Sequence, residues 1–245
     1  MKRGHHILFL TVIVQWSMLT RALSQTHWET AIYAQDTWRY FVGTTAPPAN
    51  WKTLNFDENN WSTGPGGFGY SDGDDNTTIT NTLAVFLRKS FQVDDLDEIL
   101  SAVVHGDYDD GFVAYLNGFE IARSFNMGTP GSVVLYDQTT TSDHEAVMYQ
   151  GGVPDVFVLD FNDLDGLLQE GENVFAVEVH NVNTTSSDMS SLFFLSIELN
   201  TGVSYYGTTP DWFYTPTEFT TSHLPIVVIN TNGVDIPNDN KITAH

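Results

Sequence analysis

Short apolar runs separated by turn-forming residues constrain the fold of this chain more than any other feature of its sequence. From about residue 28 onward, runs rich in Val, Phe, Tyr and Thr alternate with clusters of Gly, Asn, Asp and Pro. This texture is typical of β-strands joined by turns. The sequence therefore predicts an all-β fold, an antiparallel β-sandwich with one short helix at residues 163–169.

The strongest local prediction is a β-hairpin around the Asn-Gly pair at 117–118. Apolar side chains alternate up to this pair and away from it. Asn-Gly is preferred in two-residue type I′ turns because both positions need positive φ. We expect Leu116 to lie opposite Phe119 and Ala114 opposite Ile121, which would give one continuous apolar face.

Further strands are expected at five places along the chain. They are Trp28–Val42, Val85–Val93, Val156–Leu159, Asn173–His180 and Leu192–Leu199. The last of these is apolar on both faces and is therefore expected at the centre of its sheet. Residues 51–82 hold few apolar runs and many turn formers, which predicts a long ordered loop with a functional or ion-stabilised role.

A large excess of acidic residues narrows the classes of partner. The 245 residues include 31 Asp and Glu against 9 Lys and Arg, a formal net charge of -22. Such a charge repels nucleic acid and anionic membranes and attracts cations, so we expect no nucleic-acid partner. The chain has no cysteine, which excludes disulfides, a thiol nucleophile and Cys-ligated zinc.

The first 24 residues have the pattern of a signal peptide. Lys2 and Arg3 precede a mostly apolar run from Ile7 to Leu19, and small residues follow at Ala22 and Ser24. The apolar run is short for a membrane span. We expect cleavage near Ser24, secretion to the cell surface or medium, and no membrane span in the mature chain; an uncleaved anchor is the alternative.

Three motifs carry a resemblance to a known family. They are FDENNWSTGPGGFGYSDGDDNT at 56–77, GDYDDGFVAYLNGFEIAR at 106–123 and GENVFAVEVHNVNTTSSDMS at 171–190. In this order and spacing they resemble the galactose-binding-like jelly-roll module of exported bacterial proteins. The resemblance implies a non-catalytic accessory module over residues 25–200, of a kind that precedes a larger domain.

The C-terminal part differs in composition from the predicted sandwich. Residues 201–222 are rich in Tyr, Thr and Pro, which favours a linker, and an apolar run opens the segment 223–245. That segment is similar to the opening of a CotH-type, spore-coat kinase-like domain. The similarity implies a truncated following domain as a partner, and no catalytic region of such a domain is present in the sequence.

The acidic loop in the second motif is a candidate binding site. Asp107, Asp109 and Asp110 place three carboxylates within four residues, just before a glycine that permits a sharp turn. They would repel one another without solvent, a cation or hydrogen-bond donors between them. Three readings stay open: Ca²⁺ ligands, acceptors for sugar hydroxyls, or an acidic turn that caps backbone N–H groups.

A second acidic run, at residues 72–76, resembles the start of an EF-hand loop. The twelfth position of that loop is Leu83 instead of Glu, and the loop that starts at Asp107 has Gly118 there, so neither is an EF-hand. An irregular oxygen cage for a structural Ca²⁺ and a solvated turn both remain open. The candidate metal ligands are Asp72, Asp74, Asp75, Asp107 and Asp110.

The end of the Asn173–His180 strand carries Glu178, His180 and Asn181. No HExxH pattern supports zinc, so a structural or ligand-facing histidine is favoured over a metal ligand, on what would be a half-exposed sheet face. Four aromatics near the Gly-rich loop, Trp51, Trp61, Phe68 and Tyr70, suit either sugar stacking or stapling of the loop, with stapling favoured for Trp61 and Phe68. The candidate ligand-binding residues are Asp107, Tyr108, Asp109, Asp110, Asn117, His180 and Asn181.

Three functions follow as hypotheses. The leading one is a secreted, non-catalytic accessory module that binds carbohydrate or another cell-surface component, with Ca²⁺ as a structural ion. The second is a purely architectural partner of a CotH-like domain. The third is a hydrolase of glycosides or phosphate esters that uses the acidic loops, although the sequence has neither a Gly-x-Ser-x-Gly elbow nor a phosphate-binding P-loop.

Overall fold

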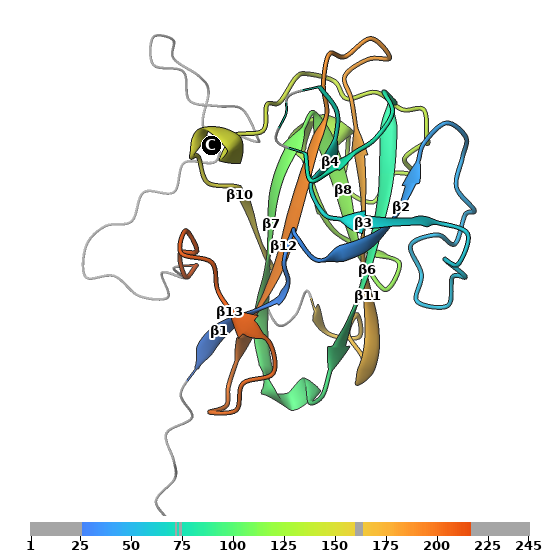
Figure 1. The fold of residues 1–245 in the computed structure, drawn as a ribbon. Coiled ribbons are helices and arrows are strands. Elements are labelled where there is room, and N and C mark those ends of the chain that lie inside the picture. The colour runs from blue at the N-terminus through green and yellow to red at the C-terminus, as the bar shows by residue number, and fades with distance from the viewer. Residues whose placement is uncertain (1–25, 72, 74, 160–163, 217–245) are drawn as a thin grey trace, which may run out of the picture.

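The structure is a computed structural model that describes residues 26–71, 73, 75–159 and 164–216. Two antiparallel sheets face one another and confirm the predicted all-β sandwich (Figure 1). Sheet A has the order β10 (Asp155–Leu159), β7 (Ile99–Asp109), β12 (Ser190–Leu199), β1 (His27–Ile32) and β13 (Gly207–Thr208). Sheet B has the order β3 (Ser62–Pro65), β2 (Thr37–Val42), β6 (Ala84–Val93), β11 (Gly171–His180), β8 (Gly111–Leu116) and β9 (Phe119–Arg123).

The main hydrophobic core lies between the two sheets. Alternate residues of each strand point into it, as the period of two in a strand requires. Val85, Leu87 and Phe91 of β6 all contribute buried side chains to this core, as predicted. The rings of Phe112 and Phe193, one from each sheet, meet at a centroid distance of 5.0 Å.

A second hydrophobic cluster covers the outer face of sheet B. Phe86 and Tyr115 from the sheet pack there against Trp51 and Trp61 from the segment that follows β2. Sheet B is therefore buried on both faces. The half-exposed sheet face expected around Glu178 is not found, because this cluster and the chain after β9 cover it.

Arg88 on β6 fastens the covering segment to sheet B. Its side chain is 2% exposed, and its Nε lies 2.7 Å from Oε2 of Glu58. Its Nη1 donates to the backbone carbonyls of Trp51 and Thr53. A single buried guanidinium thus holds both ends of residues 51–58.

The first predicted strand region is two strands that belong to different sheets. β1 lies in sheet A and β2 in sheet B, and the chain crosses between them in a turn. The backbone N–H of Asp36 donates to the Tyr33 carbonyl, and the N–H of Tyr33 donates to the Asp36 carboxylate, each at 3.1 Å. The turn contains no Gly or Pro, which is why the sequence pattern did not indicate it.

The described part of the loop expected at residues 51–82 includes three short strands. β3 lies at the edge of sheet B, and β4 (Phe68–Gly69) and β5 (Thr77–Thr78) form a small parallel pair. The loop is therefore ordered through backbone pairing as well as through the aromatic residues it carries.

The β8–β9 hairpin has the predicted turn and part of the predicted register. Asn117 and Gly118 take φ values of 51° and 98°, and Leu116 pairs with Phe119. Ala114 pairs with Ala122 instead of Ile121, because an irregularity shifts the register by one residue. The expected continuous apolar face is thereby interrupted.

Helical structure is minor. The described helical elements include three 3-10 helices of three residues each, η1 (Leu96–Glu98), η2 (Phe125–Met127) and η3 (Met148–Gln150). The helix expected at 163–169 starts outside the described residues; within them, the N–H of Leu168 donates to the Leu164 carbonyl at 3.4 Å and closes one helical turn. No helix in the described part of the chain is long and apolar enough to cross a membrane.

The sandwich continues into the interval assigned to a linker. β13 pairs with β1, and the ring of Trp212 lies 5.0 Å from the rings of His105 and Phe194 on the outer face of sheet A. Residues 201–216 therefore pack on the sandwich instead of leaving it. The predicted signal peptide and the segment 223–245 lie outside the described residues.

Gly66 is placed where the backbone of β3 passes close to the turn after β1. A Cβ at this position would lie 1.7 Å from the Ala34 carbonyl oxygen, so the main chain would have to move. We expect Gly66→Ala to lower the free energy of unfolding by about 2 kcal/mol, measured by urea denaturation. Gly202→Ala, where a Cβ meets open space, is the matched control and should change it by less than about 0.5 kcal/mol. Equal effects of the two changes would contradict this packing.

Candidate functional site

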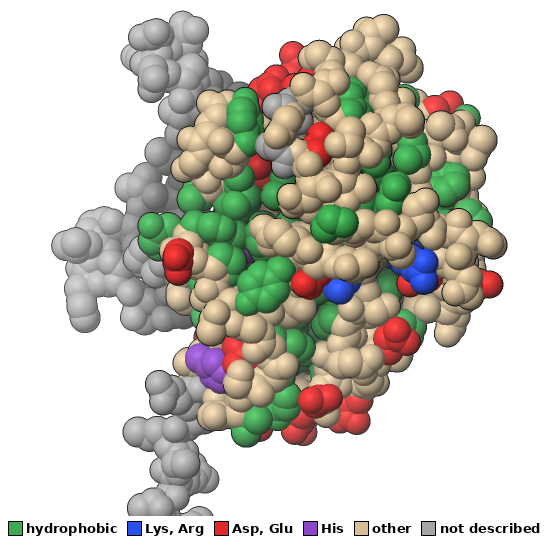
Figure 2. Space-filling model, in the orientation of Figure 1, with side chains coloured by type: hydrophobic (Ala, Val, Ile, Leu, Met, Phe, Trp, Pro, Cys, Tyr) green, Lys and Arg blue, Asp and Glu red, His purple; other side chains and the backbone are tan. Residues whose placement is uncertain are grey.

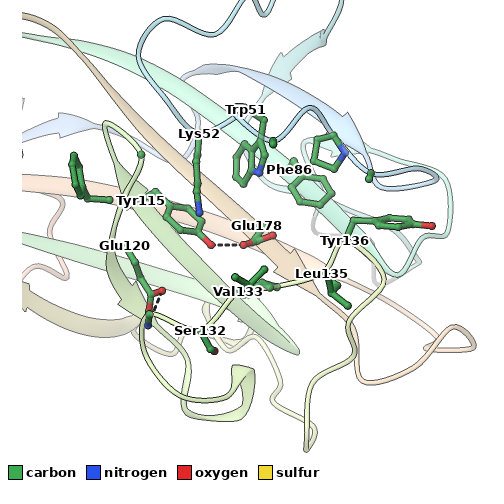
Figure 3. Close-up of a pocket in the computed structure, with 17 residues that line it drawn as sticks. Trp51, Lys52, Phe86, Tyr115, Glu120, Ser132, Val133, Leu135, Tyr136 and Glu178 are labelled. Carbon is green, nitrogen blue, oxygen red and sulfur yellow. Dashed lines mark hydrogen bonds between the residues drawn. The ribbon is translucent and has the colours of Figure 1, made fainter.

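A cavity of about 510 Å³ opens over the outer face of sheet B. Its floor is formed by Phe86 of β6, Tyr115 of β8 and Glu178 of β11, and its walls by residues 46–52 and 131–136. Figure 3 shows these side chains gathered around one space. The volume lies within the range of roughly 300–1,000 Å³ that is typical of small-ligand pockets.

Glu178 is the central polar group of the cavity. The Tyr115 hydroxyl donates to Oε1 of Glu178 at 2.5 Å, and Nε2 of His180 lies 3.3 Å from Oε2. His180 is fully buried behind the cavity, where its Nδ1 is 2.9 Å from the Gln138 carbonyl oxygen. A carboxylate has about four acceptor positions, so Glu178 retains capacity for ligand donors.

Lys52, in the wall formed by residues 46–52, supplies hydrogen-bond donors to the cavity. Its ammonium nitrogen lies 3.7 Å from the centroid of the Tyr115 ring, a cation–π contact. Burial lowers the pKa of Lys52, although the carboxylates of Glu178 and Glu120 act in the other direction. Burial also raises the pKa of Tyr115, with Glu178 adding to the effect, so the phenol remains a proton donor.

Glu120 at the rim is held by Arg123. The two side chains form a bidentate pair, with N–O distances of 2.9 and 2.7 Å. Burial alone would raise the pKa of Glu120, but the hydrogen bonds and charge of Arg123 outweigh it and lower the pKa. The carboxylate is therefore ionised and already paired.

The other side of the cavity is apolar. Pro47, Phe86, Val133, Leu135 and Tyr136 line it. Val133 is 84% exposed and Leu135 is 61% exposed, so both side chains present apolar surface to water at the wall of the cavity.

The acidic loop of the second motif lies at the junction of β7 and β8. Both oxygens of Asp107 accept backbone N–H groups, from Val147 at 2.7 Å and Met148 at 3.0 Å. Asp110 accepts from the N–H of His144 at 3.0 Å and of Val182 at 2.7 Å. Of the three readings, the structure favours the backbone-capping one for these two residues, which anchor neighbouring loops.

Tyr108 is part of a buried polar group at the same place. Its hydroxyl donates to Asp155 Oδ2 at 2.8 Å, and its ring stacks on the His144 ring at 4.2 Å. The hydrogen bond from His144 Nε2 to the same carboxylate raises the pKa of His144 and lowers that of Asp155. Tyr108 is 1% exposed and so is not open to a ligand.

Asp109 differs from its neighbours because other carboxylates surround it. Oxygens of Asp109, Glu145 and Asp188 all lie within 4.8 Å of one another. Burial, followed by the charges of Asp110, Asp188 and Glu145, raises the pKa of Asp109 from 3.8 to about 8. The acidic group that gathers in space is therefore a different set from the predicted metal ligands Asp107 and Asp110, each of which accepts two backbone N–H groups.

The remaining predicted residues are mostly structural. Asn117 bonds the N–H of Val174 and the carbonyl of Leu167, which ties the hairpin to β11. Asn181 is fully buried, and its Nδ2 donates to the Tyr70 hydroxyl at 2.8 Å. Asp75 is partly buried near the β4–β5 pair, whereas Asp72 and Asp74 lie outside the described residues.

Stapling of the loop was favoured for Trp61 and Phe68, and both residues are buried as that interpretation requires. Trp61 and Phe68 are buried in the two hydrophobic clusters, and Tyr70 is 4% exposed. Trp51 lines the cavity.

The sequence reasoning missed most of the cavity. Lys52, Tyr115, Glu120, Val133 and Leu135 were not among the candidate residues. One signal was available: Tyr115 and Glu178 alternate with core residues on neighbouring strands, among small apolar residues such as Ala176, which is typical of a covered face. The segment 131–136 carries no comparable signal, because only the tertiary fold brings it to β11.

Comparison with known proteins gives structural likenesses only. No protein-family profile matches the chain, and no curated protein sequence does. A β-glucuronidase of glycoside hydrolase family 2 aligns with a TM-score of 0.44 and 15% identity, over 71% of this chain and 18% of its own. A β-glucuronidase from an uncultured Clostridium sp. aligns with a TM-score of 0.44 and 13% identity, over 80% of this chain and 31% of its own. A family 2 glycosyl hydrolase from Bacteroides cellulosilyticus aligns with a TM-score of 0.41 and 16% identity, over 69% of this chain and 20% of its own.

This chain covers less than a third of each of these hydrolases. At such scores and identities the likeness carries no argument about activity. The assignment as a β-sandwich rests on the strand pairing itself.

Proposed function

We propose that the chain is a secreted, non-catalytic accessory module of the galactose-binding-like type, and that it binds carbohydrate in the cavity over sheet B. The observation that carries the proposal is the composition of this cavity. The partly exposed ring of Tyr136 borders it, the buried rings of Trp51 and Phe86 form its base, and Lys52 and Glu178 offer charged hydrogen-bond partners. Rings against the apolar faces of a pyranose and charged groups on its hydroxyls are the chemistry of sugar recognition.

Within the cavity over sheet B, the state of Glu120 and Glu178 supports binding over hydrolysis. A glycosidase needs one carboxylic acid with a raised pKa and a second free carboxylate. Here Glu120 is paired with Arg123 and its pKa is lowered, and Glu178 is held by Tyr115 and His180. Neither is arranged as a general acid.

The test is a glycan array followed by calorimetry of the purified chain with the sugars that bind. We expect saturable binding of one or more neutral saccharides. Turnover of chromogenic glycosides would revive the hydrolase hypothesis. Silence on the array and in calorimetry would remove the binding function.

We further infer a structural Ca²⁺ at the Asp109 cluster. Three carboxylate oxygens within 4.8 Å of one another fit around an ion that takes six to eight oxygen ligands at about 2.3–2.6 Å. Asn181 lies in the same region, since its amide bonds the Tyr70 hydroxyl and the charges of Asp109 and Asp188 act on that phenol. Its buried Oδ1 receives no hydrogen bond from the described residues, so it offers a further oxygen.

Asp109→Asn should distinguish the effect of Ca²⁺ binding on stability from the effect of protonating Asp109. A carboxyl whose folded pKa of about 8 exceeds its ordinary 3.8 stabilises the fold at low pH and loses that contribution as the pH rises through about 8. In EDTA, the free energy of unfolding of the wild type should therefore fall as the pH rises from 3.8 to about 8, by up to about 1.4 kcal/mol per pH unit. Asp109→Asn should flatten this dependence.

At pH 8, Ca²⁺ at about 100 times its Kd should add about 2.7 kcal/mol to the wild type, a rise of several degrees in Tm. Asp109→Asn should lose most of this gain. Asp165→Asn, outside the cluster, should behave as wild type. A wild type whose Tm is the same in EDTA and in Ca²⁺ would exclude the ion site.

One surface supports the architectural role as an additional function. Val156 and Val158 of β10 are exposed on the outer face of sheet A, and Tyr149 and Val153, which precede β10 in the chain, are exposed as well. Figure 2 shows hydrophobic side chains at this side of the molecule, with acidic side chains beside them and over the rest of the face in view. A following domain of the CotH type is the partner we propose for this edge.

A further inference from the structure

The polar and apolar groups of the cavity over sheet B are separated in space. Figure 3 shows Lys52, Tyr115 and Glu120 on one side of the cavity and Leu135 and Tyr136 on the other. Glu178 lies between the two sides. A uniformly hydroxylated ligand would satisfy the first side and leave the second without a partner, because apolar walls offer no hydrogen bonds.

The apolar side is open to water in the free protein. Val133 is 84% exposed and Leu135 is 61% exposed, and both line the cavity. Pro47, from the wall of residues 46–52, adds to the apolar lining of the cavity. Covering such side chains with apolar ligand atoms contributes about 0.8 kcal/mol for each buried methyl or methylene group, which is about fourfold in affinity.

The charges that line the cavity are close to balance. Lys52 is matched by Glu178, and Glu120 is matched by Arg123. The chain as a whole carries -22, so a negatively charged sugar gains little from one lysine and is repelled at long range. The ligand is therefore expected to carry no net charge.

From these three observations we propose that the cavity binds a neutral sugar bearing an acetyl group. The pyranose hydroxyls face Lys52 and Glu178, and the acetyl methyl lies against Val133 and Leu135. The inference rests on the proposed function, since it names the class of sugar that the same cavity selects.

The test compares matched saccharides by calorimetry on the full chain. Glucose, glucosamine and N-acetylglucosamine form one set, and galactose, galactosamine and N-acetylgalactosamine form the other. In at least one set the N-acetyl sugar should bind about fourfold or more tightly than the plain hexose. The cationic amine should bind no better than the plain hexose.

Val133→Thr tests the contact itself, because it exchanges a methyl for a hydroxyl in a nearly identical shape at an exposed position. It should reduce the ratio of N-acetyl to plain affinity, with Leu135 retaining part of the preference, and leave the plain hexose unchanged. Val203→Thr is the matched control, since Val203 is 54% exposed and does not line the cavity. It should leave the ratio as in the wild type.

Plain hexoses that bind as tightly as N-acetyl sugars would overturn this inference and leave the proposed function standing. An amine that binds most tightly would overturn it in favour of recognition by the carboxylates. A wild-type ratio in Val133→Thr would place the acetyl group elsewhere, and no binding by any of the six sugars or by the array would overturn both proposals.

Discussion

Arg88→Ala is expected to lower the free energy of unfolding by about 3–5 kcal/mol and to abolish sugar binding in whatever fraction remains folded. The guanidinium is 2% exposed and bonds Glu58 together with the carbonyls of Trp51 and Thr53. Its loss would leave these carbonyls without their donor beneath the covering segment. The wall that holds Trp51 and Lys52 would then lose its anchor.

The measurement is urea denaturation of the two proteins, followed by calorimetry with the tightest-binding sugar. Arg39→Ala is the matched control, because the Nε of Arg39 lies 3.6 Å from the carboxylate of the same Glu58, but its side chain is 33% exposed. Arg39→Ala should lower the free energy of unfolding by less than about 1 kcal/mol and retain sugar binding. Equal losses for the two arginines, or wild-type sugar affinity in folded Arg88→Ala, would contradict the anchoring role.

Glu178→Gln should weaken sugar binding about tenfold to a hundredfold while the fold persists. A hydrogen bond to a charged group contributes about 1.5–3 kcal/mol, and the change removes that charge from the centre of the cavity. The fold is retained because the amide oxygen can still accept from the Tyr115 hydroxyl and the amide nitrogen can donate to His180. Calorimetry gives the affinity, and thermal unfolding gives the stability.

Glu198→Gln is the control for this change. Glu198 lies on β12 in sheet A, where it accepts from the Ser101 hydroxyl, and it is remote from the cavity in the strand order. It should leave sugar affinity unchanged. If Glu178→Gln bound sugar as tightly as the wild type, the cavity would lose its central polar group as an explanation of binding.

The sequence was sufficient for the fold class because strand alternation and turn chemistry are local. The Asn-Gly pair at 117–118 determines its hairpin through the φ values of two residues. The one-residue shift opposite Ala114 could not be predicted in this way, since the φ values of the turn residues do not determine the pairing farther along the strands. The crossing between β1 and β2 was missed because its turn has no Gly or Pro.

The candidate site was harder to predict for a physical reason. Acidic residues close in sequence suggested one site, but a carboxylate beside backbone N–H groups becomes a structural acceptor, as Asp107 and Asp110 do. Asp109, Glu145 and Asp188 meet only after the sandwich forms, since they are far apart in the chain. The same holds for Lys52 and Glu178, which face one cavity across 126 positions of sequence.

The crystal structure of the chain with its tightest-binding saccharide tests the central claim most directly. The account predicts a sugar between residues 46–52 and 131–136, with a hydroxyl within hydrogen-bonding distance of the Glu178 carboxylate. A saccharide bound instead at the Asp107–Asp110 loop, with this cavity empty, would contradict it.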